Sequence, residues 1–116
     1  MITNSINKIW KVRTVKNYHE AHNHLVIGRV VEVNEVFLKL CGRTYHFRRN
    51  ILTARDVIVG IEANRVVPWN RVEIVNELPT SFDYKEAVLS MDKDGRVVLN
   101  DGNYICPICE KSDKGF

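Results

Sequence analysis

Cysteine is scarce in this chain, and long apolar runs are missing from it. Three cysteines stand among 116 residues, an odd number that makes a poor disulfide framework and favours a reducing compartment. The first fifteen residues lack the continuous apolar core of a signal peptide. No window approaches the roughly 18 apolar residues of a membrane span. We therefore expect a cytoplasmic protein with no membrane partner.

The motifs of the common enzyme classes are also missing. The sequence has no P-loop, no dinucleotide-binding glycine pattern and no serine nucleophile elbow. Asp56, Glu62 and Glu73 fall at the edges of predicted strands, and nothing pairs them. We expect a non-enzymatic protein with no catalytic residues; a small enzyme would need a cleft lined by the histidines of residues 19–24.

Positive charge is unevenly distributed along the chain. Residues 1–79 carry 12 Lys and Arg against 7 Asp and Glu, a balance of +5, whereas residues 80–116 carry 5 against 7, a balance of −2. This asymmetry is compatible with a polyanionic partner for the first part, and equally with an ordinary solvated surface.

The stretch 25–75 has the pattern of short β-strands, because β-branched residues recur there with a period of two. Gly42-Arg43 and Ala63-Asn64 are predicted turns, Trp69-Asn70 is a predicted 3₁₀ turn, and residues 76–81 are a predicted linker. Gly28 lies inside a predicted strand, where glycine usually marks a bulge or a sharp bend. The predicted extended segments are 8–15, 25–33, 35–41, 44–49, 56–62, 65–67 and 71–75.

The C-terminal part carries two strong turn signals, Asp92-Lys93-Asp94-Gly95 and Asp101-Gly102. They predict a three-stranded meander that ends in Cys106-Pro-Ile-Cys109. A short helix over residues 85–91 is the alternative to its first strand.

Residues 27–40 resemble the first signature of the Sm-like (LSm) family. Gly28, Val30 and Val33-Asn34 match its glycine, its apolar residue and its apolar–acidic pair, with Asn in place of Asp. Phe37 falls at its Met, and Leu38 replaces its Asn. The second signature of the family is Ile-Arg-Gly followed by another β segment. Residues 58–60 and 64–67 resemble it, with Val59 in place of the Arg.

This resemblance implies an all-β protein with a small, strongly bent Sm/SH3-like barrel over residues 1–78. A short C-terminal β-hairpin appendage would follow over residues 79–116. By the same resemblance we expect a homo-oligomer that binds single-stranded RNA near the turn that carries Phe37.

Aromatic and basic residues alternate over residues 43–49. On a strand, Arg43, Tyr45, Phe47 and Arg49 would share one face. Such a face offers rings for base stacking and charge for phosphates; alternatively the two aromatic rings pack in the core. The predicted nucleic-acid site comprises Phe37, Arg43, Tyr45, His46, Phe47, Arg48, Arg49, Arg65 and Arg71.

Trp69 follows Pro68 between two arginines. It is either a recognition aromatic for a ligand or a plug at the end of the barrel. The sequence leaves both interpretations open.

Cys106 and Cys109 have the spacing of two zinc ligands. Further ligands would come from His19, His22 and His24 or from another chain, and Cys41 is a weaker candidate. A redox pair and two unpaired thiols are the alternatives. If zinc binds, the rival function is a protein–protein interaction module whose C-terminal hairpin completes a structural zinc site.

Overall fold

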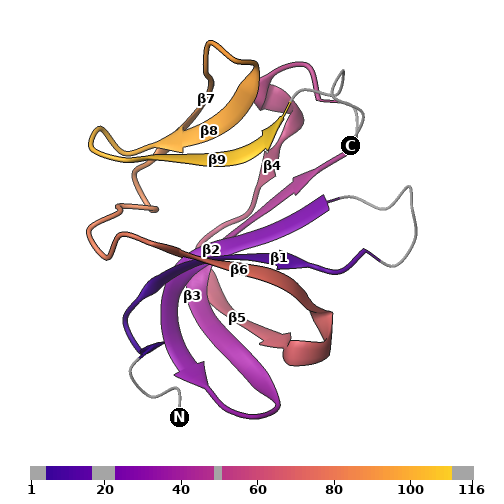
Figure 1. Cartoon of the computed structure of the whole chain (residues 1–116), viewed down its shortest axis with the longest axis vertical. Coiled ribbons are helices and arrows are strands. Elements are labelled where there is room, and N and C mark those ends of the chain that lie inside the picture. Colours follow the sequence, from indigo (N-terminus) through magenta and orange to yellow (C-terminus); the bar gives the residue numbers. More distant parts are fainter. Residues whose placement is uncertain (1–4, 17–22, 49–50, 111–116) are drawn as a thin grey trace.

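The computed structural model describes residues 5–16, 23–48 and 51–110, which form two antiparallel sheets and no α-helix (Figure 1). The predicted all-β fold is therefore confirmed. The first sheet contains β1 (Ile9–Thr14), β2 (Asn23–Val33), β3 (Phe37–Phe47), β4 (Ile58–Val59), β5 (Ala63–Pro68) and β6 (Val72–Leu78). The second contains β7 (Val88–Met91), β8 (Arg96–Asn100) and β9 (Ile105–Glu110).

The first sheet curls into a small, strongly bent barrel. Its strand order is β4-β3-β2-β1-β6, and β5 also pairs with β3. The first half of β3 pairs with β5 and the second half with β4, so the strand bends from one neighbour to the other. The predicted 3₁₀ turn is present as Trp69–Arg71 and connects β5 to β6. The concave side encloses a core of Trp10, Val12, Val26, Val30, Leu38, Leu40 and Val67.

The bend rests on two glycines that face each other. Gly28 of β2 lies opposite Gly42 of β3. A methyl group on Gly28 would overlap the Cys41 carbonyl and the Gly42 Cα, and one on Gly42 would overlap the Ile27 carbonyl. The predicted turn at Gly42-Arg43 is wrong, because this glycine lets β3 cross closely over β2 and the strand continues unbroken.

Two further boundaries also differ from the predicted ones. The strand predicted over residues 56–62 is only the two residues of β4, because Thr53 and Asp56 form a capping box around a 3₁₀ turn at Ala54–Asp56. Ala63-Asn64 is not a turn, since both residues pair with β3 at the start of β5. The predicted linker begins later, because β6 extends to Leu78.

The C-terminal meander is confirmed, and β7 replaces the alternative helix. The second sheet covers the outer face of the first (Figure 1). Their shared core includes Leu25, Ile27 and Tyr45 from the first sheet and Val97, Leu99 and Cys106 from the second. Within the described ranges, no helix has the length and apolar character needed to cross a membrane.

Candidate anion-binding cleft

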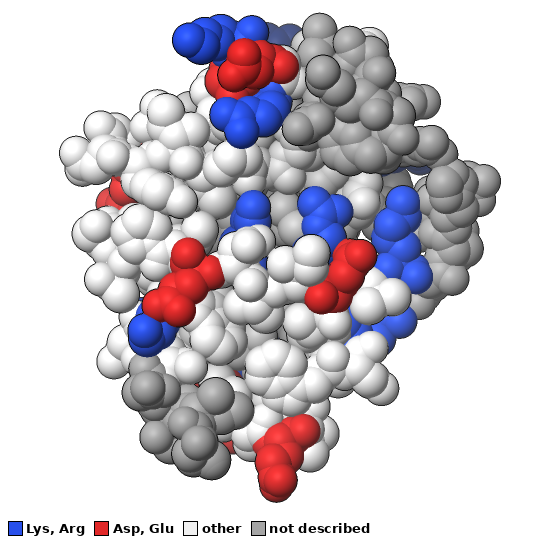
Figure 2. All heavy atoms as spheres, viewed as in Figure 1, with Lys and Arg blue, Asp and Glu red and all other residues white. Residues whose placement is uncertain are grey.

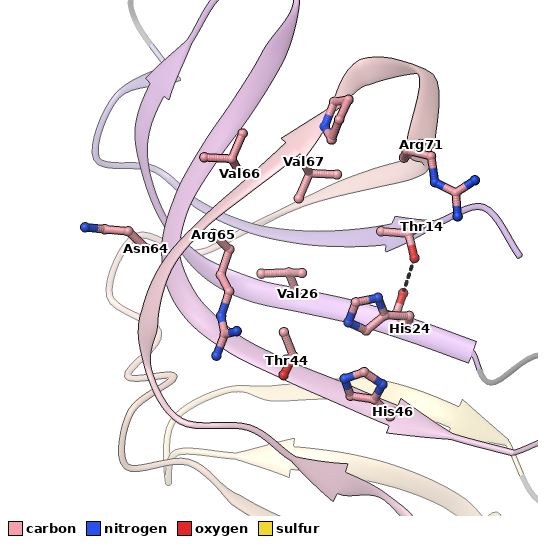
Figure 3. A pocket seen from close by; sticks show the side chains of 11 residues that line it. Thr14, His24, Val26, Thr44, His46, Asn64, Arg65, Val66, Val67 and Arg71 are labelled. Atoms are coloured by element: carbon pink, nitrogen blue, oxygen red, sulfur yellow. Dashed lines mark hydrogen bonds between the residues drawn. The ribbon is translucent and has the colours of Figure 1, made fainter.

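An open cleft of about 570 Å³ lies at the end of the barrel, between β2, β3, β5 and the 3₁₀ turn after β5 (Figure 3). This volume falls in the range of small-molecule sites in proteins. Four of the lining residues are apolar, four are basic, and three carry hydroxyl or amide groups. The lining residues are Thr14, His24, Val26, Thr44, His46, Asn64, Arg65, Val66, Val67, Pro68 and Arg71.

Strand pairing brings two histidines together at the floor of this cleft. His24 of β2 lies opposite His46 of β3 in the antiparallel register. Their ring centroids are 4.1 Å apart, and the rings are tilted by 32°. The backbone at His24 is also held from β1, since the Thr14 hydroxyl donates a hydrogen bond of 3.3 Å to its carbonyl. The imidazoles are thus fixed by three strands.

Arg65 approaches the histidines from β5. Its guanidinium and the two imidazoles lie on the same side of the first sheet (Figure 3). Nη2 of Arg65 donates to the Ile61 carbonyl at 2.5 Å, whereas its Nε is buried with no hydrogen-bond partner among the described residues. The Nε2 atom of His24 is also buried and has no hydrogen-bond partner among the described residues. Buried polar atoms are normally paired, so these two atoms lack the hydrogen bonds that such atoms usually make.

The electrostatic potential of the cleft is positive. Burial lowers the pKa of His24 below its ordinary value, and the charges of His46 and Arg65 lower it further. Arg71 stands at the rim, where its Nη2 donates to the Val15 carbonyl at 3.1 Å. Among the described residues that line the cleft none is acidic. The chemistry of this lining therefore fits an anion that also has an apolar part.

The structure brings together three residues of the predicted nucleic-acid site, His46, Arg65 and Arg71. It does not bring the predicted aromatic face to the surface. Tyr45 and Phe47 are only 1% and 3% exposed, because this face of β3 is covered by the second sheet. The prediction that they stack on bases is wrong, and their core packing raises the pKa of Tyr45 to about 12.

The other predicted residues of that site are scattered. Phe37 is half-buried at the opposite end of β3, where it pairs with Pro68. Arg43 is half-buried on the face of β3 that the second sheet covers, and its Nε has no hydrogen-bond partner among the described residues. Arg48 is exposed just after β3. Arg49 lies outside the described residues.

Both cysteines of the C-terminal pair point into the shared core. Residues three apart on a regular strand face opposite sides, but β9 carries a bulge where it passes Val97 and Val98. The bulge turns Cys106 and Cys109 to the same side, where they are 1% and 6% exposed. Burial raises the pKa of both thiols, that of Cys109 to about 11.

The predicted zinc ligands are not assembled by the described residues. His24 faces the cleft, whereas the two cysteines belong to the core on the other side of β2. No group of three or more His, Cys, Asp or Glu occurs in the described ranges. His19 and His22 lie outside those ranges. The expectation that His24 joins Cys106 and Cys109 at one metal is therefore wrong, while the pairing of the two cysteines stays a prediction.

Trp69 has a structural role. Its Nε1 donates a hydrogen bond of 2.7 Å to the Asn34 carbonyl, and its ring packs against the barrel core. Of the two interpretations that the sequence left open, the structure supports the plug at the end of the barrel.

No protein-family model, no curated protein and no solved structure matches this chain.

Proposed function

We propose that this protein is a non-enzymatic, oligomeric binder of single-stranded RNA that holds a nucleotide in the cleft. The observation that carries the proposal is the convergence of Arg65, Arg71 and the adjacent pair His24–His46 on a cleft whose described lining includes no acidic residue. Arginine binds phosphate oxygens through charge and planar donor geometry.

The apolar residues of the lining favour a nucleotide over a bare inorganic anion. Val26, Val67 and Pro68 form an apolar surface beside the charged groups. Imidazole rings also stack on the unpaired bases of single-stranded RNA. The proposed arrangement places the base against the apolar side and the phosphate beside the arginines.

The free edges of the barrel support the proposed oligomer. In the described residues, β5 pairs only with β3 and β6 pairs only with β1, so each has an unpaired edge. Val66 on β5 and Ile74 on β6 are 56% and 49% exposed. Unpaired edges with apolar side chains favour pairing with another chain.

A salt titration of RNA binding tests the proposal. A fluorescein-labelled oligouridylate of about 12 nucleotides is titrated with the protein, and anisotropy is measured at increasing salt. Phosphate contacts make the affinity fall steeply, by about 0.7 in log K per contact for each tenfold change in salt. Arg65→Gln should weaken binding about tenfold, whereas Lys93→Gln, a matched charge loss in an exposed turn, should have little effect. Absence of binding at low salt refutes the proposal.

A further inference from the structure

A second row of basic side chains lies outside the cleft. Figure 2 shows Lys and Arg side chains in a row along the seam between the second sheet and strands β1 and β6. Lys11 and Arg13 belong to this seam, because β1 places them on the face opposite the buried Val12. Nζ of Lys11 donates to the Pro107 carbonyl of β9 at 2.9 Å, which fixes the position of the side chain between the two sheets.

Among the residues that the structure describes, these cations have no carboxylate partner. Both side chains are half-buried, yet Lys11 bonds to a carbonyl and Arg13 to the Asn23 amide oxygen rather than to a carboxylate. The ion pairs among the described residues are Lys8–Glu77, Lys85–Glu62 and Arg96–Asp92. A half-buried cation without a counter-charge costs free energy, and an anionic ligand would remove that cost.

Arg71 connects the seam to the cleft. It lines the cleft, and it holds the end of β1 through two bonds with Val15, one from its side chain and one to its carbonyl. Arg13 lies on the same strand just before that end. Lys11 and Arg13 lie on the face of β1 opposite the cleft, so a chain of phosphates that leaves the cleft at Arg71 would cross the end of β1 to reach Arg13 and then Lys11. The exposed carboxylate of Glu73 lies beside this path, at the irregularity where β6 passes Arg13 and Thr14.

We propose that the seam formed by Lys11 and Arg13 is a second phosphate-binding segment, which continues the RNA path from the cleft along β1. This inference rests on the proposed RNA binding. It predicts a site longer than one nucleotide, with the first phosphate at the cleft and the following ones between the two sheets.

The test measures how the affinity for a short and a long RNA changes when the seam is altered. Labelled oligouridylates of about 4 and about 12 nucleotides are titrated with the wild type and with the doubly substituted Lys11→Gln/Arg13→Gln protein. The longer RNA should bind the variant roughly tenfold more weakly at about 0.1 M salt, with a salt slope smaller by about 1.4. The shorter RNA, held in the cleft, should bind both proteins equally.

Two controls keep the outcomes separate. Lys39→Gln/Lys93→Gln removes the same charge from positions away from the seam, and circular dichroism verifies that every variant is folded. Glu73→Gln, which removes the adjacent carboxylate, should tighten the longer RNA a few-fold. If the wild type binds neither RNA, the proposed function fails. If Arg65→Gln weakens both RNAs but Lys11→Gln/Arg13→Gln weakens neither, the cleft binds RNA and the seam does not.

Discussion

Gly28 and Gly42 lie opposite each other in β2 and β3, and each occupies the space that a side chain of the other would need. The pair sits where β3 changes its partner from β5 to β4. At this point β2 and β3 pack against the barrel core on one face and against the second sheet on the other. Both the bend of the barrel and the position of the cleft therefore depend on the absence of a methyl group at these two positions.

Gly28→Ala should lower the free energy of unfolding by about 3 kcal/mol, because the new methyl group meets backbone atoms that have no room to move. Gly42→Ala should behave alike. Urea unfolding followed by circular dichroism measures both. Gly102→Ala is the control: nothing lies within 4 Å of its added carbon, and only the positive φ of 96° opposes it, so about 1 kcal/mol is expected. Equal losses at all three positions would contradict the packing explanation.

The sequence predicted the fold class, the C-terminal meander and the 3₁₀ turn at Trp69 because each depends on local pattern. It did not reveal that β3 is continuous. A glycine inside a strand and a glycine at a turn look alike in a sequence, and the sequence does not show that Gly28 lies opposite Gly42. The alternating pattern correctly predicted that Tyr45 and Phe47 share one face of β3. Which sheet covers that face is set by tertiary packing, which alternation cannot specify.

The sequence predicted only some of the residues that line the cleft. Arg65, Arg71 and His46 were predicted from charge and from neighbouring aromatics, whereas Thr14, Thr44 and the role of His24 were missed. One signal was available: His24 and His46 each lie eleven residues from Glu35, which lies in the turn between β2 and β3. The bulge in β9, which turns Cys106 and Cys109 to one side, had no comparable signal.

Removing the Tyr84 hydroxyl should loosen the attachment of the second sheet. This hydroxyl lies 2.7 Å from the Cys41 carbonyl and 2.8 Å from Glu62 Oε2, and it joins the segment before β7 to the barrel. Burial and the Glu62 contact raise the pKa of Tyr84, while the same hydrogen bond lowers the pKa of Glu62. Tyr84→Phe should cost about 1 kcal/mol in unfolding free energy. Tyr104→Phe should cost less, since the Tyr104 ring packs on Phe82 and the shared core, and its hydroxyl makes no hydrogen bond with the described residues.

The two cysteines of β9 should be protected from thiol reagents. Both are buried and have raised pKa values, and the thiolate is the reactive form. We expect the half-buried Cys41 to react first with an aromatic disulfide reagent and the other two only after unfolding. The protection should persist in EDTA, because packing alone provides it. Faster reaction of Cys106 and Cys109 in EDTA would instead support the predicted zinc pairing.

Stability should fall as the pH is lowered through the titration range of His24. Its folded-state pKa lies below the ordinary value of 6.5, so between the two values the unfolded chain binds more protons than the folded protein. The free energy of unfolding therefore rises with pH in this window and levels off above about 6.5. His24→Asn should flatten the profile below about pH 6.5. An unchanged profile would show that the proton uptake belongs to other groups.

RNA affinity should have the opposite pH dependence. A bound phosphate favours the protonated imidazole and raises the His24 pKa, so binding takes up a proton and strengthens as the pH falls. Anisotropy titrations at several pH values measure this, and His24→Asn should remove most of the slope.

The mass in solution tests the unpaired edges of β5 and β6. We expect a particle of several times the 13.4 kDa of one chain, formed when the edge of β5 in one copy pairs with that of β6 in the next. Such head-to-tail contacts form a ring if the rotation between copies closes and an open filament if it does not. Val66→Lys places a charge at the β5 edge and should reduce the mass measured by light scattering towards that of one chain. Val36→Lys, at a residue 70% exposed in the turn before β3, should leave the mass unchanged. A monomeric wild type would contradict the proposed oligomer. It would also contradict the expectation, drawn from the Sm-like resemblance, that the chain assembles with copies of itself.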